Sequence, residues 1–303
     1  MNRFFSQSGV LLFNKPLGLT SHRATQVVSR LLNATKAGHT GSLDPMATGL
    51  LPICLGEATK FCAYLLRADK AYQATLQFGV TTTTGDKEGE ILTQQPVNFD
   101  EIALKKALMQ HCGNITQIPP MYSALKYQGK PLYRYARKGI TLERLPRPIS
   151  IYQIDLLNYQ FDQATIFVVC SKGTYIRTLA EDIGRVLGCG AHLFALQRVQ
   201  VGSYYLKDAI TLTQLKNLAD KNRQNQLLPS DSLIDHLPKI TLDPKTALCF
   251  QQGQRVSISH QSDDILGDFR VYMDTTQTFI GIGKIREKGV LLPDRLMTFP
   301  HVN

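Results

Sequence analysis

The stretch GHTGSLDPMATGLLP, residues 38 to 52, constrains the fold more than any other part of this sequence. Its three glycines and two prolines rule out a continuous helix, and Pro45 disfavours the helical conformation for Asp44. Apolar residues before it follow helical spacing from about residue 22 to 33, and Leu50–Leu55 is typical of a buried strand. The sequence therefore predicts an ordered loop between a helix and a strand, and this loop presents one carboxylate.

Asp44 is open to three interpretations at this level. An aspartate before a proline is a common turn residue, because its side chain can bond the backbone two residues on. It could also be a catalytic nucleophile or base. A lone metal ligand is disfavoured, since no cluster of histidines, cysteines or carboxylates accompanies Asp44. The spacing alone leaves the turn and the catalytic interpretation open.

Helical and strand periodicities recur along the rest of the chain. Residues 72–80 alternate apolar and polar, which predicts a strand whose apolar face begins at Tyr72. Residues 176–187 carry a helical apolar stripe after Gly173, so Tyr175 and Arg177 lie at a strand-to-helix junction. Further helices are expected at 58–66, 104–112 and 217–229, and further strands at 151–159, 164–170 and 190–206.

The last 60 or so residues have a different sequence pattern from the rest of the chain. From about residue 240 the pattern changes to short β segments at 255–259, 269–273 and 278–282, rich in glycine. A chain of 303 residues can form one large domain and one small one. The sequence therefore predicts a small β-barrel-like module after the main domain.

The charge balance favours a polyanionic partner such as nucleic acid. Lysine and arginine number 34 against 24 aspartates and glutamates, a net charge of +10. Seven of these cations lie between Lys126 and Arg147, where only Glu143 opposes them. Four tyrosines lie in or beside the segment, and aromatic rings stack on unpaired bases while cations hold phosphates. This pattern favours a nucleic-acid contact, with Lys126 and Lys130 as candidate phosphate ligands, over a merely solvated loop.

Several classes of protein are disfavoured by the same composition. The six cysteines form no CxxC pair and lie in apolar or helical contexts, which argues against a zinc site and a disulfide framework. Reduced, buried thiols in a cytoplasmic protein are expected instead. The apolar run at residues 9–13 is too short for a signal-peptide core, and no apolar stretch is long enough to span a bilayer.

Four motifs follow one another along the chain: NKPLGLTS at 14–21, GHTGSLDPMATGLLP at 38–52, KAYQA at 70–74 and SKGTYIRTLAEDIG at 171–184. Together they resemble the bacterial tRNA pseudouridine-55 synthase (TruB) family. The resemblance extends through PPMYSALKYQGKPLYRYARKG and GAHLFALQRVQVG to GIGKI and LLPDRL near the C-terminus, so it covers nearly the whole chain. GSLDPxATG is the specific motif, because other pseudouridine synthase families carry different sequences around their aspartate.

The resemblance implies an α+β pseudouridine synthase fold with a mixed, largely antiparallel sheet. It implies a catalytic domain over residues 1–240, with an RNA-gripping insert at about 120–150, and a small β-rich PUA-like domain over 241–303. Enzymes of this family isomerise uridine 55 in the T-loop of tRNA. They break the N1–C1′ bond, rotate the flipped uracil and rejoin it through C5. The implied partner is the tRNA T stem-loop, bound by a cytoplasmic monomer that uses no metal or other cofactor.

The resemblance also assigns catalytic roles to single residues. Asp44 matches the catalytic aspartate, which acts as a nucleophile at C1′ or a base at C2′, and sequence does not choose between them. Tyr72 matches the tyrosine that stacks on the uracil and is a candidate for the C5 proton transfer. Arg177 matches the arginine that pairs with the aspartate and keeps it ionised and aimed.

The remaining matched residues concern the substrate. Tyr175 and Leu196 match residues that line the uracil pocket. His39 matches the histidine that fills the T-loop space left by the flipped base, although a lone histidine is more often structural. Lys15 matches a motif lysine that is expected to brace the site rather than perform chemistry.

Two rival functions remain open from the sequence. The first is a non-catalytic RNA-binding protein or tRNA-folding chaperone on the same scaffold, and intact Asp44, Tyr72 and Arg177 argue against this as the sole role. The second is a related synthase for another RNA, including guide-RNA-dependent members with similar motifs. The bacterial-type insert and the short C-terminus disfavour this second rival.

Overall fold

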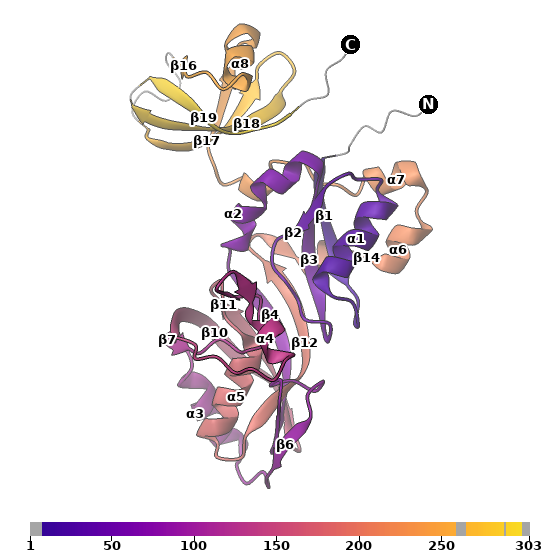
Figure 1. Cartoon of the computed structure of the whole chain (residues 1–303), viewed down its shortest axis with the longest axis vertical. Helices are drawn as coiled ribbons and strands as arrows, with labels where there is room; N and C mark the ends of the chain where they lie inside the picture. The colour runs from indigo at the N-terminus through magenta and orange to yellow at the C-terminus, as the bar shows by residue number, and fades with distance from the viewer. Residues whose placement is uncertain (1–7, 259–264, 288, 299–303) are drawn as a thin grey trace.

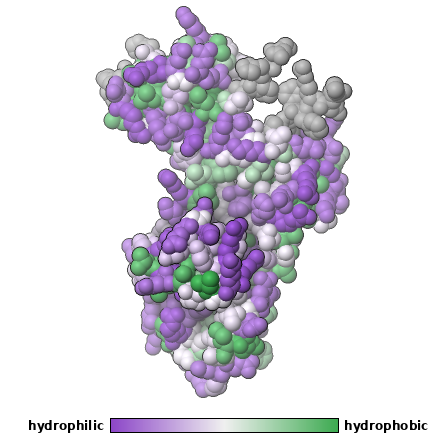
Figure 2. Space-filling view, in the orientation of Figure 1, coloured by the Kyte–Doolittle hydropathy of each residue, from purple (hydrophilic) through white to green (hydrophobic). Residues whose placement is uncertain are grey.

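The computed structural model describes residues 8–258, 265–287 and 289–298. Within these residues the chain forms an elongated body and a smaller module at one end of it, drawn in yellow in Figure 1. Figure 2 shows the visible face covered mainly by hydrophilic residues, with hydrophobic ones in small groups. Among the described residues, none of the helices combines the length and the hydrophobicity needed to cross a bilayer.

A mixed sheet of ten strands, formed by described residues, runs through the body in the order β14-β1-β3-β12-β4-β11-β10-β7, with β13 beside β12 and β2 beside β3. Only the β1–β14 and β3–β12 pairs among these are parallel. The expected mixed, largely antiparallel sheet is thus confirmed. The bounds are β1 (Gly9–Lys15), β2 (Ala37–His39), β3 (Ala47–Leu55), β4 (Lys70–Phe78), β7 (Gly113–Gln117), β10 (Arg147–Gln160), β11 (Gln163–Cys170), β12 (Ala191–Val201), β13 (Tyr204–Tyr205) and β14 (Ile210–Thr211).

Strand β12 holds the two halves of this sheet together. Its parallel edge pairs with β3 and its antiparallel edge with β4, so the N-terminal strands reach the middle strands only through it. One continuous apolar cluster extends across both halves, from Leu11 and Ile53 on one side to Leu76 and Ile166 on the other. The strands therefore align segments that are far apart in sequence along one rigid surface.

Helices cover this sheet where their apolar stripes meet it. Helix α1 (Ser21–Leu31) begins at Thr20, whose hydroxyl accepts a hydrogen bond from the Arg23 amide at 3.1 Å. Helix α5 (Ile176–Val186) packs on β12 so closely that a Cβ at Gly184 would lie 2.3 Å from the Ala191 nitrogen. The body also contains, outside the basic insert, η1 (Gly56–Phe61), α2 (Cys62–Leu66), α3 (Glu101–Met109), η2 (Leu206–Asp208), α6 (Leu212–Asn217), α7 (Asp220–Gln224) and η3 (Ser232–Ile234).

Two expected elements differ from those in the structure. The strand expected over 190–206 is a hairpin, because β12 ends at Val201 and Gly202 turns the chain with a φ of +56° before β13. The prediction of one helix over 217–229 is wrong, because the structure has two short helices, α6 and α7, in this region. A capping box at Thr211 starts α6 earlier, and the extended conformation of Leu218 separates α6 from the short α7.

The smaller module is a second sheet with a core of its own. Its strands, in the order β15-β17-β18-β19-β16, enclose residues such as Phe250, Phe269 and Val271. The bounds are β15 (Lys239–Leu242), α8 (Pro244–Gln251), β16 (Val256–Ser257), β17 (Gly267–Met273), β18 (Thr278–Glu287) and β19 (Val290–Leu296). The β segments expected from sequence are present, except that Ser259, the end of the first, lies outside the described residues.

The module contacts the body through a shared apolar cluster, which includes one aromatic pair, and through several polar contacts. Phe61 of the body meets Phe279 of β18 edge to face, with 5.4 Å between ring centroids. Asp231, in the segment that leads to the module, is buried and accepts hydrogen bonds from the Tyr272 hydroxyl and, at 3.2 Å, from Arg270. These contacts set how the module is held against the body.

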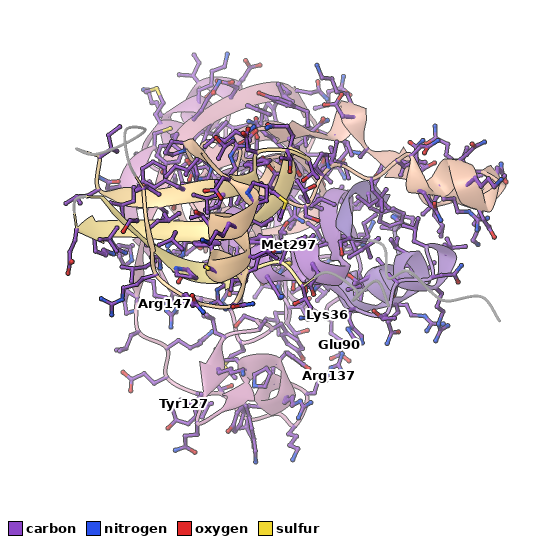
Figure 3. All side chains as sticks on the ribbon, turned by 90° about the horizontal axis from the view of Figure 1, so that it is seen from above. Lys36, Glu90, Tyr127, Arg137, Arg147 and Met297 are labelled. Atoms are coloured by element: carbon purple, nitrogen blue, oxygen red, sulfur yellow. The ribbon has the colours of Figure 1, made fainter. Side chains whose placement is uncertain are left out.

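The basic segment between β7 and β10 forms a separate insert. It contains a hairpin of β8 (Lys126–Tyr127) and β9 (Lys130–Pro131), followed by α4 (Leu132–Ala136). The Tyr127 and Tyr135 rings meet edge to face at 6.1 Å. Figure 3 shows Tyr127 and Arg137 on the part of the insert that projects beyond the body and the module. A further small hairpin, β5 (Val80–Thr82) with β6 (Ile91–Gln94), follows β4.

Candidate active site

The loop that carries Asp44 is hydrogen-bonded to the first residue of α1 and to the segment before it. The Ser21 hydroxyl donates to the Leu43 carbonyl at 3.0 Å and accepts from the Leu43 amide at 2.7 Å. The Gly18 amide donates to the Pro45 carbonyl at 2.8 Å. Bonds on both sides of Asp44 therefore fix the backbone of an acid whose side chain stays 40% exposed. The loop therefore combines a fixed turn with a partly exposed carboxylate, so both interpretations of Asp44 from the sequence are compatible with its geometry.

Lys15 supports the same loop from within the protein. Its side chain is fully buried, and Nζ donates to the Leu19 carbonyl at 2.6 Å and to the Pro45 carbonyl at 3.5 Å. Burial lowers the pKa of Lys15 to about 8, against the opposing charge of Asp44. The lysine thus lies close enough to act on the aspartate electrostatically, while its own hydrogen bonds go to backbone carbonyls.

Arg177 forms an ion pair with Asp44. Its Nε lies 3.0 Å from Asp44 Oδ2, and its guanidinium also donates to the Thr84 carbonyl at 3.1 Å and the Tyr122 carbonyl at 2.7 Å. The arginine is 5% exposed, so its fork is held in one orientation. Tyr122 begins the basic insert, which means that one cation links the aspartate loop with the root of the insert.

A second carboxylate, Asp86, lies near the same nitrogen of Arg177 as Asp44 does. Its Oδ2 lies 3.8 Å from Arg177 Nε, and its Oδ1 accepts from the Thr84 hydroxyl at 2.6 Å and the Glu88 amide at 3.1 Å. Sequence reasoning missed this buried residue, because TTTTGDKEGE resembles a solvated hairpin loop. The only available signal was an aspartate between glycines, the same pattern that drew attention to Asp44.

The environment of Asp44 shifts its proton affinity upward. Burial disfavours the charged form and raises the pKa of Asp44, while the Arg177 charge opposes this shift. Asp86 adds a like charge that raises the pKa further, and Lys15 lowers it. The carboxylate is thereby more basic than an ordinary aspartate, but it retains a cation that favours ionisation.

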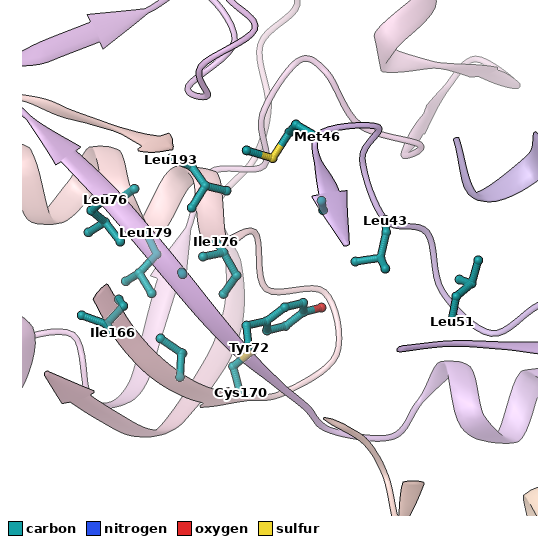
Figure 4. Packing of buried hydrophobic residues seen from close by; sticks show 14 of the residues in the cluster. Leu43, Met46, Leu51, Tyr72, Leu76, Ile166, Cys170, Ile176, Leu179 and Leu193 are labelled. Carbon is teal, nitrogen blue, oxygen red and sulfur yellow. The ribbon is translucent and has the colours of Figure 1, made fainter. Parts of the chain in front are cut away.

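Tyr72 lies in the core with its hydroxyl directed at the aspartate loop. Figure 4 shows the ring beside Cys170 and Ile176 and its oxygen pointing toward the side of Leu43. The residue is 9% exposed, and burial raises its pKa, while the charge of Arg198 opposes that effect. The strand face expected from sequence therefore exists, and Tyr72 stands at its end nearest the loop.

The other candidate residues lie around this group at different depths. The Gln117 side chain brackets Tyr175 by accepting from its amide at 2.8 Å and donating to its carbonyl at 3.0 Å. Leu196 of β12 is half-buried and pairs with Ala47 of β3. His39 is half-buried at the end of β2, and burial lowers its pKa, with the charge of Arg198 acting in the same direction.

The insert lysines occupy a different position from the rest. Lys126 and Lys130 are exposed on the β8–β9 hairpin, where they present their charge to solvent. The structure therefore pairs Asp44 with Arg177, places Lys15 beneath the same loop and leaves the two insert lysines on an outer surface. Among the described residues, no group of three or more histidines, cysteines or carboxylates is arranged to hold a metal ion.

Family models match three consecutive segments of the chain. Residues 29–176 match the TruB family pseudouridylate synthase N-terminal domain, and residues 177–235 match the tRNA pseudouridylate synthase B C-terminal domain. Residues 238–297 match the C-terminal region of pseudouridine synthase II TruB. The tRNA pseudouridine synthase B of Methylobacillus flagellatus is 52% identical over 95% of both chains. That of Chromobacterium violaceum is 50% identical over 95% of this chain and 94% of the relative.

This chain belongs to the TruB family. Solved structures of more distant proteins share the fold. A chain in the crystal structure of a Cbf5-Nop10-Gar1 complex matches 95% of this chain and 84% of its own length, with a TM-score of 0.71 and 24% identity. A chain in the structure of an H/ACA RNP bound to a substrate RNA containing 2′-deoxyuridine matches 97% and 86%, with a TM-score of 0.69 and 22% identity.

This TruB-family site presents a single carboxylate to solvent. One partly exposed carboxylate is aimed by an arginine, and a phenol hydroxyl points to the same loop. The second carboxylate, Asp86, is only 5% exposed and is directed at the arginine rather than at solvent. Asp86 is therefore placed to orient Arg177, while Asp44 is the acid that a substrate can reach.

Proposed function

We propose that this chain isomerises uridine 55 in the T-loop of tRNA to pseudouridine, with Asp44 as the catalytic carboxylate. The observation that carries the proposal is the Asp44–Arg177 ion pair at 3.0 Å on a fastened, partly exposed loop. It occurs in a chain about half identical to enzymes named tRNA pseudouridine synthase B over nearly its whole length. The alignment supports the substrate, and the geometry supports the choice of carboxylate.

In the proposed reaction Asp44 acts on the ribose of the flipped uridine, as a nucleophile at C1′ or as a base at C2′. The N1–C1′ bond breaks, the uracil rotates within the site, and C5 bonds to C1′. The C5 proton then leaves to Tyr72, and N1 takes up a proton. The substrate keeps all its heavy atoms and its overall oxidation state, so the isomerisation needs no redox cofactor.

Base flipping supplies a role for the surrounding residues. Extruding a base takes a few kcal/mol, and stacking contributes about 1–3 kcal/mol per base. Tyr72 stacks on the uracil, Tyr175 and Leu196 line its pocket, and His39 occupies the space that the base leaves. The lowered pKa of His39 supports this, because a neutral imidazole stacks without a charge to desolvate.

The remaining surface would hold the RNA. In our proposal residues 1–240 form the catalytic domain, and the insert at about 120–150 closes over the T stem-loop with Lys126 and Lys130 on its phosphates. The module at 241–303 is a PUA-like RNA-binding domain. The link from Arg177 to the Tyr122 carbonyl supports a coupling of insert position to the catalytic ion pair. We propose a cytoplasmic enzyme that acts as a monomer without a partner protein.

An Asp44→Asn variant tests the central assignment. It should bind an unmodified T stem-loop as the wild type does and release no tritium from C5-labelled uridine. Asp155→Asn, at an exposed position on β10, is the matched control and should keep full turnover. Turnover by Asp44→Asn at the wild-type rate would refute the role of Asp44.

The substrate is tested separately from the residue. The wild-type protein should convert a T stem-loop with uridine at position 55 and leave one with cytidine there unchanged. RNA from cells that lack the protein should lose pseudouridine at position 55 of tRNA. If position 55 stayed modified, the proposal would give way to a synthase for another RNA. If the protein bound RNA but converted none, it would give way to a non-catalytic RNA-binding role.

A further inference from the structure

Arg198 is a buried cation that sequence reasoning did not assign to any function. It lies in β12, is 1% exposed, and is the largest of the fully buried side chains of the described residues. Among those residues it forms no ion pair with a carboxylate. A buried charge without an opposite charge is unfavourable by several kcal/mol unless hydrogen bonds compensate it. The compensating groups therefore show what this arginine is held for.

Backbone carbonyls on both sides of Asp44 supply the compensation. Arg198 Nε donates to the Leu50 carbonyl at 2.7 Å, and Nη2 donates to the Gly41 carbonyl at 3.0 Å. Nη1 lies 3.5 Å from the Ser42 carbonyl. The guanidinium thus spans the base of the aspartate loop, from the residues that enter it to the strand that leaves it.

The strand register places the same arginine beside Tyr72. Arg198 is paired with Tyr72 across β12 and β4, and with Gly49 across β12 and β3. Side chains at directly opposite positions of antiparallel strands project from one face, with Cβ atoms about 4.5–5.5 Å apart. Gly49, Arg198 and Tyr72 therefore lie side by side on the neighbouring strands β3, β12 and β4.

The charge of Arg198 acts on the Tyr72 hydroxyl. Burial raises the pKa of Tyr72 overall, and the charge of the adjacent guanidinium opposes this rise. In return, burial lowers the pKa of Arg198 and the tyrosine raises it. A phenol next to a fixed cation loses its proton more readily than a phenol in an apolar core.

We propose that Arg198 is a positioning residue that holds the Tyr72 oxygen and the aspartate loop in one register and favours the phenolate of Tyr72, so that this oxygen can take the C5 proton. The inference rests on the proposed function. In this step the C5–H bond breaks and its electron pair forms the C5–C6 double bond. The π pair of the C6=N1 double bond, which formed when C5 bonded to C1′, moves to N1, and N1 takes up a proton from water. Tyr72 becomes a neutral phenol and returns its proton to water.

Two substitutions separate the charge of Arg198 from its contacts. Arg198→Lys and Arg198→Met both lose the fork that binds the carbonyls, but only lysine retains a charge. The comparison is made from pH 6 to 7, where a buried lysine such as Lys15, with a pKa of about 8, still carries its proton. Folding is checked by thermal melting, and affinity by binding of an unmodified T stem-loop.

Single-turnover release of tritium from C5-labelled uridine 55 is the readout. We expect Arg198→Lys to react at least tenfold faster than Arg198→Met at equal RNA affinity, since one pKa unit is a factor of ten. The same two substitutions are then compared in a Tyr72→Phe background. There the ratio of the Arg198→Lys rate to the Arg198→Met rate should fall below about twofold, because the hydroxyl on which the charge acts is absent. A gap of equal size in both backgrounds, or no loss of rate in either variant, overturns the proposal.

A second readout covers variants that are too slow or too unstable for this cycle. The rate for the wild type should rise with pH as the phenolate fraction grows, and the curve should move to higher pH in Arg198→Met or, if that protein does not fold, in Arg198→Gln. A uniform loss of rate at every pH overturns the proposal and leaves Arg198 as a support for the loop. Absence of tritium release by the wild type would instead contradict the proposed function itself.

Discussion

Gly49→Ala should damage the protein more than any comparable glycine substitution in the body. Gly49 lies on β3 five residues after Asp44, with a φ of +104°. An added Cβ would lie 2.3 Å from the Arg198 carbonyl oxygen and 2.7 Å from its nitrogen. Both are backbone atoms of a central strand, so no side chain can rotate away, and β3 and β12 must separate.

Two contributions set the magnitude. A left-handed conformation is unfavourable for alanine by about 1–2 kcal/mol. Overpacking a well-filled interior adds about 1–3 kcal/mol. We therefore expect Gly49→Ala to lower the free energy of unfolding by about 2–5 kcal/mol, or the melting temperature by roughly 4–10 °C. Turnover should fall as well, because the displaced backbone is that of Arg198, which pairs with both Gly49 and Tyr72.

Gly188→Ala is the matched control for the backbone term. Gly188 has a φ of +79° in the same domain, and nothing lies within 4 Å of an added Cβ. We expect Gly188→Ala to lower the free energy of unfolding by only about 1–2 kcal/mol and to leave turnover unchanged. Thermal melting and tritium release measure both variants. If Gly49→Ala melted within 2 °C of Gly188→Ala, at about 1 kcal/mol or less between them, and turned over normally, the close approach of β3 and β12 would be wrong.

Three further predictions follow from the site and its surroundings. Asp86→Asn removes a like charge that raises the pKa of Asp44, so the acid limb of the kcat profile should move to lower pH; an upward or absent shift contradicts this. Joint replacement of Lys126 and Lys130 by alanine should reduce the slope of log affinity against log salt by about 1.4–1.8, and an unchanged slope would exclude phosphate contacts by them. Asp231→Asn should weaken the attachment of the module by about 1.5–3 kcal/mol, seen as earlier proteolytic release with turnover of a T stem-loop retained; equal protease resistance would contradict it.

Local patterns in the sequence predicted most of the fold's elements. The 3.6-residue spacing located α1, α3 and α5, and the alternation from Tyr72 located β4, because these elements bury one face against a single core. The pairing of β12 between β3 and β4 could not be read in the same way. It joins segments that are roughly 110 to 150 residues apart, and no local pattern records which strand lies beside which.

Only those residues of the candidate site that lie in an unusual local sequence pattern could be predicted. Asp44 stands out in a loop of glycines and prolines, and Arg177 at a strand-to-helix junction, but their contact is a property of the assembled sheet. Asp86 and Arg198 were missed for opposite reasons. Asp86 lies in a polar hairpin that resembles a solvated turn, and Arg198 lies in a strand where a charged residue is expected to face water. Burial turns both into positioning groups, and burial is not visible in composition.

The position of β12 also dictates when the enzyme can first become active during its synthesis. Strands β1 and β3 leave the ribosome early, and β4, β11 and β10 can pair as a separate meander. These two groups of strands can join only when β12, residues 191–201, has emerged and pairs with both β3 and β4. This occurs when about two thirds of the chain has been synthesised. A nascent chain stopped before residue 191 should therefore contain Asp44, Tyr72 and Arg177 and still be unable to modify RNA. Because pairing across such sequence separations is slow, completion of the site should lag behind formation of its parts.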